Sequence, residues 1–395
     1  MIRLERQVVA VSGSGWELNE VTTLEGLASL RGDWDRLVET LEAPTPFHSW
    51  TWNWSWWKHF GRGALRILVI RRQGQVRGIA QFHERRHGGL VTSLAPIGWG
   101  NRLTEHLDLI FPESDHDELL QAVTAWLGRQ RCTWTWLPGL RPGSTEVVGG
   151  PVANVFENAV PFEYLDLPGS WEVLVAGLNK SMRDNVKYYP KLMLRNGHDF
   201  RFRVAGSPTE VCEALPTLFR LHNLRAGMQG GVGHRDYLKD SSHQEFLGEV
   251  MPALAVAGQA KIGLLEVGEE VVAAISWLER EDSICLYYTG FEPSWSKYSV
   301  VTVATSEVLK YAIVAGIRRI DFLRGTDPFK RRWGTTQRMT VEVAVAKRPA
   351  LVRPVLRAAV AGRRRLRHLR HRLATTVGPT YRNANQIEVE AAPLN

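Results

Sequence analysis

The stretch Tyr287–Gly334 reads YYTGFEPSWSKYSVVTVATSEVLKYAIVAGIRRIDFLRGTDPFKRRWG, and its pattern decides the fold class of the chain. An apolar strand that ends at Phe291 leads through a serine-rich loop into a helix at Val300–Ala315, which Gly316 is well placed to stop. A second apolar strand, Arg319–Leu323, follows at once and ends in charge and glycine. Strand, loop, helix and strand in this order predict an α/β unit.

The same order of elements occurs twice along the chain. In the second half, the strands that lead into the stretch above are predicted at Ala260–Val267, Glu270–Glu279 and Ser283–Phe291. In the first half, the corresponding elements are strands at Leu65–Arg71, Gln75–His83, Leu90–Ile97 and His106–Phe111, a helix at Asp115–Arg129 and a strand at Cys132–Leu137. Helices precede both sets, at Leu24–Leu41 and Trp50–Phe60 and at Ser170–Asn196 and Glu210–Leu224. We therefore predict a duplicated α/β unit.

The boundary between the two units is predicted at residue 160, because Gly143–Phe156 is rich in Gly, Val and Pro and is typical of a loop. This divides the chain into an N-terminal domain (1–160), a C-terminal domain (161–346) and a tail (347–395). The chain has 395 residues, 44% of them hydrophobic, which is ordinary for a globular protein of two or three domains. Its three cysteines are far apart and predict neither a disulfide framework nor a metal centre.

Basic charge is concentrated near the C-terminus. Eleven of the 49 Lys and Arg residues lie between Lys347 and Arg382, where there is no acid. The rest of the chain has 38 Lys and Arg residues and 41 acids, so it is nearly neutral. Leucines and valines at helical spacing predict a basic amphipathic helix at Pro349–Leu373. Through residues 351–373 it could contact an anionic membrane or pack on the body; nucleic acid is the less favoured partner. No secretory signal precedes the first unit, so we expect a cytoplasmic protein, peripheral at most on the inner face of the membrane.

The start of the helix at Val300 is a candidate anion site. Free amide groups and the helix dipole attract a phosphate there, and Lys297 and the hydroxyl of Ser299 lie just before it. Alternatively, Ser299 only caps the helix.

Polar residues at the end of the following strand are candidates for catalysis. Asp321 lies between apolar residues, so it either pairs with an arginine such as Arg324 or Arg331 or lines a cavity. Lys330 lies close behind and could stabilise negative charge on a substrate or an oxyanion, or belong to a solvated turn.

Two further side chains could take part in proton transfer. His222 lies at helical spacing from leucines and is either a packed helical histidine or a base. Tyr287 and Tyr288 should alternate faces on their strand, and we expect Tyr288 to line the site as an acid. The glycine-rich stretch Arg225–Gly233 is predicted to be a mobile loop over the cleft between the domains.

Taken together, these segments resemble the GNAT acyltransferase superfamily, and within it the acetyltransferase-like family associated with cellulose and other polysaccharide biosynthesis. That family is related in fold to the Fem-type peptidoglycan aminoacyltransferases. The resemblance spans residues 30–340. It is carried by Tyr287–Pro293, Tyr298-Ser299, Gly316, Asp321–Gly325, Phe329-Lys330 and Trp333-Gly334, and upstream by Pro46-Phe47, Trp50–Gly61, Lys180–Asn185, Leu221-His222 and Lys261–Leu278.

The resemblance implies an α/β fold of two tandem GNAT-like domains with mixed, mostly antiparallel sheets. It implies acetyl-CoA or another acyl-CoA as donor and no metal. The pantetheine would lie along Ser283–Phe291, with Phe291 and Val300 at the donor, and Lys297 and Ser299 would face its phosphates. An amine or hydroxyl would attack the thioester directly. Arg183 and Arg324 would bind the substrate, Arg183 through a phosphate or carboxylate.

One departure from the family pattern bears on the donor. The family has Pro-Gly after the Tyr-Ser pair, where this chain has Val300-Val301, and β-branched side chains crowd the approach of a phosphate to the backbone. We expect an acyltransferase that acts on a cell-envelope or polysaccharide precursor, a small molecule or a lipid-linked saccharide. The alternatives are a Fem-like transferase, which would bind charged tRNA, and a non-catalytic GNAT-fold assembly protein.

Overall fold

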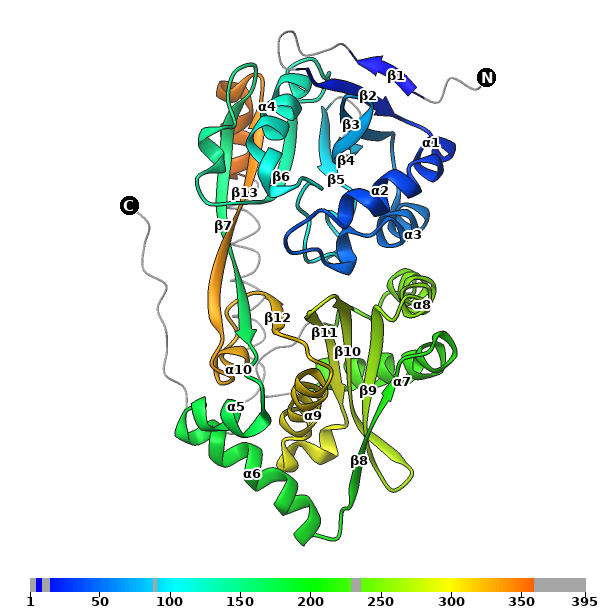
Figure 1. The fold of residues 1–395 in the computed structure, drawn as a ribbon, viewed down its shortest axis with the longest axis vertical. Coiled ribbons are helices and arrows are strands. Elements are labelled where there is room, and N and C mark those ends of the chain that lie inside the picture. Colours follow the sequence, from blue (N-terminus) through cyan, green and yellow to red (C-terminus); the bar gives the residue numbers. More distant parts are fainter. Residues whose placement is uncertain (1–4, 9–14, 88–90, 229–235, 359–395) are drawn as a thin grey trace.

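The computed structural model describes residues 5–8, 15–87, 91–228 and 236–358. Its strands form one continuous 13-stranded sheet in the order β1-β2-β3-β4-β5-β6-β13-β7-β12-β11-β10-β9-β8. Figure 1 shows the first half of the chain above the second, with two long strands running between them. The predicted α/β fold with a mixed, mostly antiparallel sheet is confirmed, although the two halves share one sheet. In the described part of the chain, no helix combines the length and apolar character needed to cross a membrane.

The second half follows the predicted order closely. The antiparallel strands are β8 (Phe200–Ala205), β9 (Ala260–Val267), β10 (Glu270–Arg280) and β11 (Ser283–Phe291). A 3-10 turn, η4 (Pro293–Tyr298), leads into α9 (Val300–Val314), and β12 (Arg319–Arg324) returns parallel to β11. The remaining helices are α5 (Trp171–Gly177), α6 (Lys180–Arg195), α7 (Pro208–Ala226), α8 (Ser241–Ala255) and the short α10 (Pro328–Arg331).

The first half repeats this plan. Helices α1 (Leu24–Ser29), α2 (Arg31–Val38) and α3 (Trp50–Phe60) follow β1 (Glu5–Val8) and β2 (Glu17–Val21). Next come β3 (Leu65–Arg72), β4 (Gln75–His87), β5 (Val91–Pro96), α4 (His116–Leu127) and β6 (Trp134–Leu140), with β5 parallel to β6. The predicted strand at His106–Phe111 is wrong: this segment is a loop. A bridge between Ile79 and Ile110 and a hydrogen bond from the Gln81 side chain to the carbonyl of Asp108 tie it to β4.

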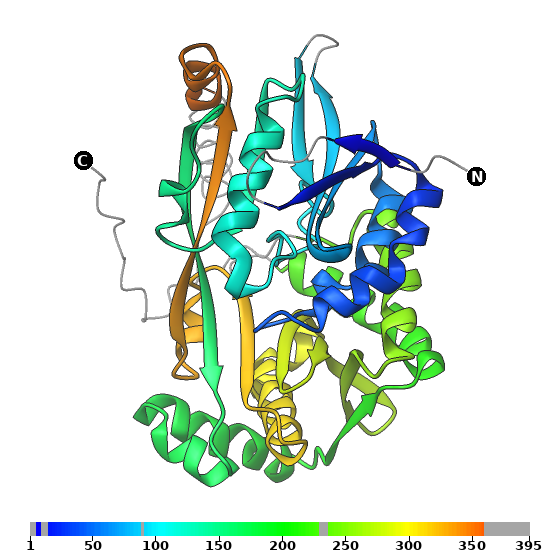
Figure 2. The same cartoon turned by 45° about the horizontal axis from the view of Figure 1, so that its top comes forward.

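Strands β7 (Ala153–Asp166) and β13 (Thr336–Ala346) join the halves, and the sequence pattern predicted neither of them. β7 pairs with β13 from Ala153 to Tyr164 and with β12 from Phe162 to Asp166, and β13 also pairs with β6. The predicted loop at Gly143–Phe156 is therefore wrong from Ala153 onwards, where β7 begins. The predicted boundary at residue 160 falls inside β7, and the division into domains stays a prediction. Figure 2 shows both strands running from one half to the other in a second view.

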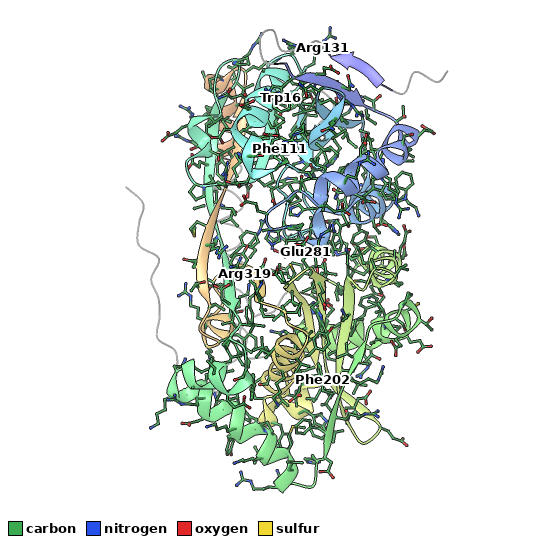
Figure 3. All side chains as sticks on the ribbon, viewed as in Figure 1. Trp16, Phe111, Arg131, Phe202, Glu281 and Arg319 are labelled. Atoms are coloured by element: carbon green, nitrogen blue, oxygen red, sulfur yellow. The ribbon has the colours of Figure 1, made fainter. Side chains whose placement is uncertain are left out.

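A second junction joins α3 to α8. Glu249 of α8 accepts hydrogen bonds from Ser55 and Lys58 and lies 3.1 Å from the ring nitrogen of His59. Side chains fill the space between the halves (Figure 3). The two junctions lie on opposite sides of the molecule in Figure 1, and the loop after β5 lies between them.

The tail begins as predicted, as a helix, within the described residues 349–358. Val352 and Leu356 are buried against Trp134 and Val155, so its first turns pack on the body, while Leu351 and Val355 face solvent. The rest of the predicted tail helix and most of the predicted glycine-rich loop (229–235) lie outside the described residues.

The contact of α7 with β11 has no room for a side chain at Gly290. A Cβ there would lie 2.3 Å from the amide nitrogen of His222 and 2.4 Å from the carbonyl carbon of Leu221. Because both are backbone atoms, we expect Gly290→Ala to force helix and strand apart and to lower the free energy of unfolding by about 1–3 kcal/mol in urea titrations. Gly248→Ala, in an open position of α8, is the control and should be stabilising by about 0.5–1 kcal/mol. Equal stability of the two variants would contradict this packing.

Candidate active site

A buried histidine–aspartate pair joins the two halves of the molecule. Oδ2 of Asp321, on β12, lies 2.6 Å from Nε2 of His106, in the loop after β5, and the two residues are 215 positions apart. Oδ1 of the same carboxylate accepts a 2.6 Å hydrogen bond from the amide of Leu323. Of the two alternatives expected for Asp321, the pairing with an arginine is therefore wrong: Arg324 lies beside Glu105 and Arg331 beside Glu163.

The ring of His106 is held between aromatic side chains of both halves. It stacks on Phe162 of β7 with the ring centroids 4.7 Å apart, and Phe47 lies 6.0 Å away. Burial alone would lower the pKa of His106, but the charge and hydrogen bond of Asp321 outweigh it and raise that pKa above its ordinary value of 6.5. With Nε2–H donating to Asp321, the other ring nitrogen, Nδ1, carries the lone pair that can accept a proton.

A second pair lies beside the first. Nε2 of His48 is 3.0 Å from Oδ2 of Asp108, and the rings of His48 and His106 have their centroids 6.3 Å apart. Burial would raise the pKa of Asp108, but His48 and His106 hold it at about 2, so Asp108 is a carboxylate at neutral pH.

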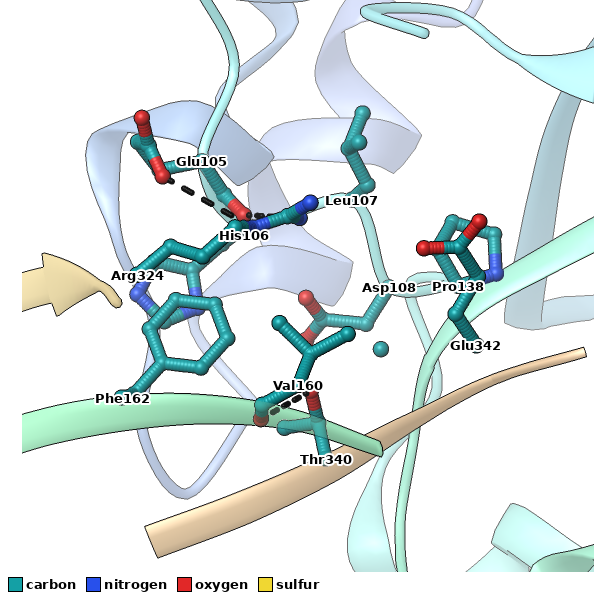
Figure 4. A pocket seen from close by; sticks show the side chains of 11 residues that line it. Glu105, His106, Leu107, Asp108, Pro138, Val160, Phe162, Arg324, Thr340 and Glu342 are labelled. Atoms are coloured by element: carbon teal, nitrogen blue, oxygen red, sulfur yellow. Dashed lines mark hydrogen bonds and ion pairs between the residues drawn. The ribbon is translucent and has the colours of Figure 1, made fainter. Parts of the chain in front are cut away.

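A pocket opens where the loop meets β7, β12 and β13 (Figure 4). Its cavity volume is about 10 Å³, which is room for about one water molecule, so it is a shallow hollow in this structure. Its wall is formed by Glu105, His106, Leu107, Asp108, Pro138, Gly139, Val160, Phe162, Arg324, Thr340 and Glu342. Three of these residues are acids, so the pocket presents more carboxylates than cations. Burial raises the pKa of Glu105, and the charge of Arg324 opposes this rise.

The strands β11 and β12 part beside the histidine–aspartate pair. They are paired only from Ser283 opposite Arg319 to Cys285 opposite Asp321. Beyond this point β12 leaves β11, and Leu323 has a left-handed backbone with φ of 64°. A parallel pair that opens in this way leaves backbone groups of β11 without a strand partner on that side.

The opening of β11 coincides with a bulge. Ile275 and Trp277 of β10 pair with Thr289 and Leu286, so the two tyrosines between them face a single residue. The expected alternation of Tyr287 and Tyr288 is therefore lost. Their ring centroids lie 4.2 Å apart, and both side chains join the same core. Tyr288 is buried beside His222, and burial raises its pKa, which keeps the phenol protonated.

The loop before α9 holds the residues predicted to face donor phosphates. Lys297 is exposed and its ammonium lies 4.7 Å from the ring centroid of Tyr298. Ser299 has φ of 47° and does not cap α9 through its side chain; its hydroxyl lies 2.9 Å from that of Thr302. Val300 is fully buried in the core, so only Val301 stands partly at the surface. Phe291 ends β11, paired with Ala273.

Lys330 is engaged by the backbone rather than open to a substrate. Its ammonium donates to the carbonyl oxygens of Leu323 and Arg324, at 3.1 and 2.7 Å, and so holds the end of β12. Burial lowers its pKa from the usual value.

Two other predicted site residues lie away from the pair. Nδ1 of His222, on α7, is 3.1 Å from the carbonyl oxygen of Thr289, and the ring is buried against Tyr288. Arg183, on α6, donates to the carbonyl of Ala176. Of the predicted residues, the structure brings Asp321, Arg324 and Lys330 together at the end of β12, whereas Arg183 and His222 belong to other contacts.

The first half has the same opening, but it is closed. β5 and β6 pair only at Ser93–Trp134 and Leu94–Thr135. The loop after β5 then lies between β4 and β6: Ile110 bridges Ile79 of β4, and a Cβ at Gly139 of β6 would lie 2.7 Å from Asp108. Within the loop, a Cβ at Gly98 would lie 2.8 Å from Leu107. The loop that fills the opening between β5 and β6 thus also carries His106 and Asp108 towards the opening between β11 and β12.

Sequence reasoning missed four residues of the candidate site: His48, Glu105, His106 and Asp108. A signal was present, because residues 104–108 read TEHLD, and His106 and Asp108 are two positions apart, as on one face of an extended segment. Among the described residues, His106, Cys285 and Asp321 could also hold a metal ion, since one ligand atom from each lies within 4.8 Å of the others. In this structure His106 and Asp321 bond to one another instead.

Residues 180–331 match the family model described as an acetyltransferase (GNAT) domain. No curated protein matches the chain. Among solved structures, FemX is similar with a TM-score of 0.57 and 11% identity, over 79% of this chain and 95% of that one. L-PGS from Bacillus licheniformis has a TM-score of 0.47 and 11% identity, with coverages of 79% and 90%. A tandem GNAT protein from the clavulanic acid biosynthesis pathway has a TM-score of 0.43 and 12% identity, with coverages of 84% and 98%.

The GNAT domain match lies over the half that contains α9, β11 and β12, and it supports a transferase. At 11% identity the likeness to FemX establishes the fold alone. The resemblance to the polysaccharide-biosynthesis type within the superfamily stays a prediction.

The raised pKa of His106 should make stability depend on pH. A raised pKa in the folded state means that the stabilisation is complete below the unfolded value near 6.5 and is lost as pH rises through the folded value. We expect the free energy of unfolding to fall as pH rises above 6.5, and this slope to disappear in His106→Gln. His116→Gln, which alters the outlying His116–Asp117 pair, should keep the wild-type slope. Urea titrations across this range, with imidazole titration by NMR, are the measurement; an unchanged slope in His106→Gln refutes the assignment.

Proposed function

We propose that the protein is an acyltransferase that moves an acyl group from acyl-CoA to an amine of a cell-envelope or polysaccharide precursor. One observation carries the proposal: the opening between β11 and β12 begins at the Cys285–Asp321 pair, where Asp321 binds His106. A donor lying in that opening would bring its reactive carbon beside a buried histidine.

The donor arm would complete the sheet along β11. Pantetheine carries amide groups that can bond to the unpaired backbone groups of a strand. At the far end of the strand, the amide groups that begin α9 and the exposed Lys297 would meet the phosphates. Because Val300 points into the core, only Val301 crowds this approach.

His106 is the proposed base. Its Nδ1 takes a proton from the attacking amine while Asp321 stabilises the imidazolium that forms. The amine nitrogen bonds to the thioester carbon, the C–S bond breaks, and the proton passes to the thiolate or to solvent. Lys330 holds the end of β12, the strand that carries Asp321. Its effect on catalysis would therefore be to position Asp321.

The acids of the pocket favour an amine over a hydroxyl. Asp108 is ionised at neutral pH, and Glu105 and Glu342 line the same wall. An ammonium group would be attracted by these carboxylates before it gives up its proton, whereas a hydroxyl would gain no such attraction.

A Fem-like transferase is the second candidate, and the Ser299–Val301 segment favours it. This segment lacks the glycine that lets a pyrophosphate approach the backbone. Transfer from aminoacyl-tRNA would use the same base and the same opening, with a different carrier for the acyl group.

Donor binding is the first test. Calorimetric titration with acetyl-CoA and with free CoA should show saturable binding, and Lys297→Glu should weaken it about tenfold because it reverses a charge beside the phosphates. Lys310→Glu on the outer part of α9 is the matched charge control and should bind normally. No binding of either ligand up to millimolar concentrations would point to another donor.

Loss of the base should lower kcat more than it alters donor binding. We expect His106→Gln to reduce kcat by about 10²–10⁴-fold while the Kd for the donor stays near wild type. In the wild type, kcat should rise with pH through the raised pKa of His106, since the base must be unprotonated. His116→Gln is the control. A pH profile that is the same in wild type and His106→Gln would exclude this histidine as the base.

A further inference from the structure

Helix α6 presents a strongly basic face to solvent. Its inner side, with Met182, Val186 and Met193, is buried against the body. Its outer side carries five bases at spacings of three and four residues, which place them along one stripe about 24 Å long. They are Lys180, Arg183, Lys187, Lys191 and Arg195.

These bases are not neutralised by the protein. Asp184, the single acid on α6, is exposed on the same face, four residues after Lys180 and three before Lys187, so the face carries five bases and one acid. In the part of the chain that the structure describes, none of the five bases forms an ion pair. By contrast, Arg201 and Arg203 on the neighbouring β8 both pair with Glu266. The body is nearly neutral outside the tail, so this helix is a local excess of positive charge.

Large apolar side chains project from the same face. Leu194 is 51% exposed and Tyr188 is 49% exposed, and both lie within or beside the basic stripe. Val173 of the adjoining α5 is 60% exposed. Single exposed apolar residues need no explanation, but apolar groups set among bases on one helix face are typical of surfaces that lie on a bilayer.

The basic face continues to the candidate donor loop. Asn196, just after α6, donates a 3.0 Å hydrogen bond to the hydroxyl of Tyr298, and Lys297 lies over the ring of that tyrosine. A membrane beneath α6 would therefore lie close to the loop that carries Lys297.

We propose that the outer face of α6, formed by its five bases with Leu194 and Tyr188, docks the protein on an anionic lipid bilayer. Lipid headgroups attract the bases, and the acyl boundary takes up the apolar side chains. A nucleic-acid backbone would satisfy the charges but would leave the leucine and tyrosine in water. The proposal is independent of which donor or acceptor the site uses.

The test compares full-length variants on vesicles. Each Lys or Arg near an anionic leaflet adds about fivefold to binding, so Lys187→Gln, Lys191→Gln and Arg195→Gln together should weaken binding to vesicles of phosphatidylcholine with one quarter phosphatidylglycerol about a hundredfold. The control removes Arg62, Arg129 and Arg131 in the same way. These residues are exposed on the first half, and Arg131 lies at the opposite end of the molecule (Figure 3). The control should bind like wild type.

A local probe separates this face from the tail. An environment-sensitive dye on Leu194→Cys, with Cys132 and Cys212 replaced by serine, should shift to the blue when these vesicles are added, and a dye on Val256→Cys of the exposed end of α8 should not. Wild-type binding by the triple variant, a probe at residue 194 that stays in water, or no vesicle binding at all overturns the proposal. If the triple variant instead loses affinity for a 20-nucleotide RNA while its vesicle binding is unchanged, the face binds nucleic acid. That result also overturns the membrane proposal.

Discussion

The pairing of β13 with β7 is the constraint on which the rest of the structure depends. Eleven residue pairs join the two strands, and the last described strand of the chain thereby returns to the first half and completes its sheet beside β6. The same β7 pairs with β12 at its other end. The two halves therefore cannot move apart without breaking ladder hydrogen bonds, which are costly to leave unmade in a buried sheet. This fixed relation is what allows a 2.6 Å contact between His106 of one half and Asp321 of the other.

The two halves repeat one plan but use it differently. Each has a parallel strand pair that opens after two or three residues, β5 with β6 and β11 with β12. In the first half the loop after β5 occupies the opening, and Gly139 of β6 leaves room for it because a Cβ there would collide with Asp108. In the second half η4 and α9 follow the opening instead. In the first half the chain itself therefore fills the opening, and the loop that fills it also carries His106 and Asp108 to the candidate site.

Local pattern predicted the elements well wherever an apolar run was bounded by turn residues. The strands Ala260–Val267 and Ser283–Phe291 have the bounds expected from the sequence. β7 was missed because Pro161 and several polar residues interrupt it, and such interruptions usually mark a loop. Asp321 was identified as a buried charge in need of a partner, but its partner was not, because an arginine nearby in sequence is a more obvious choice than a histidine 215 residues away. The candidate site depends on contacts between the two halves, and the local periodicity of the sequence cannot predict such contacts.

The histidine–aspartate pair also explains why a buried carboxylate is tolerated on β12. An unpaired charge at this position would be costly, and the cations nearby in sequence are engaged elsewhere. Arg319 pairs with Asp166 and Arg324 lies beside Glu105, while Lys330 donates to the carbonyls of Leu323 and Arg324. Asp321 instead receives one bond from its own strand and one from His106. The histidine can lose its proton and keep the Nε2–H bond, whereas a lysine or arginine in its place could only hold the charge. If Asp321 needed a partner for stability alone, an arginine would serve. Proton transfer requires a partner that can titrate, and His106 is such a partner at the wall of a pocket and at the start of a strand opening.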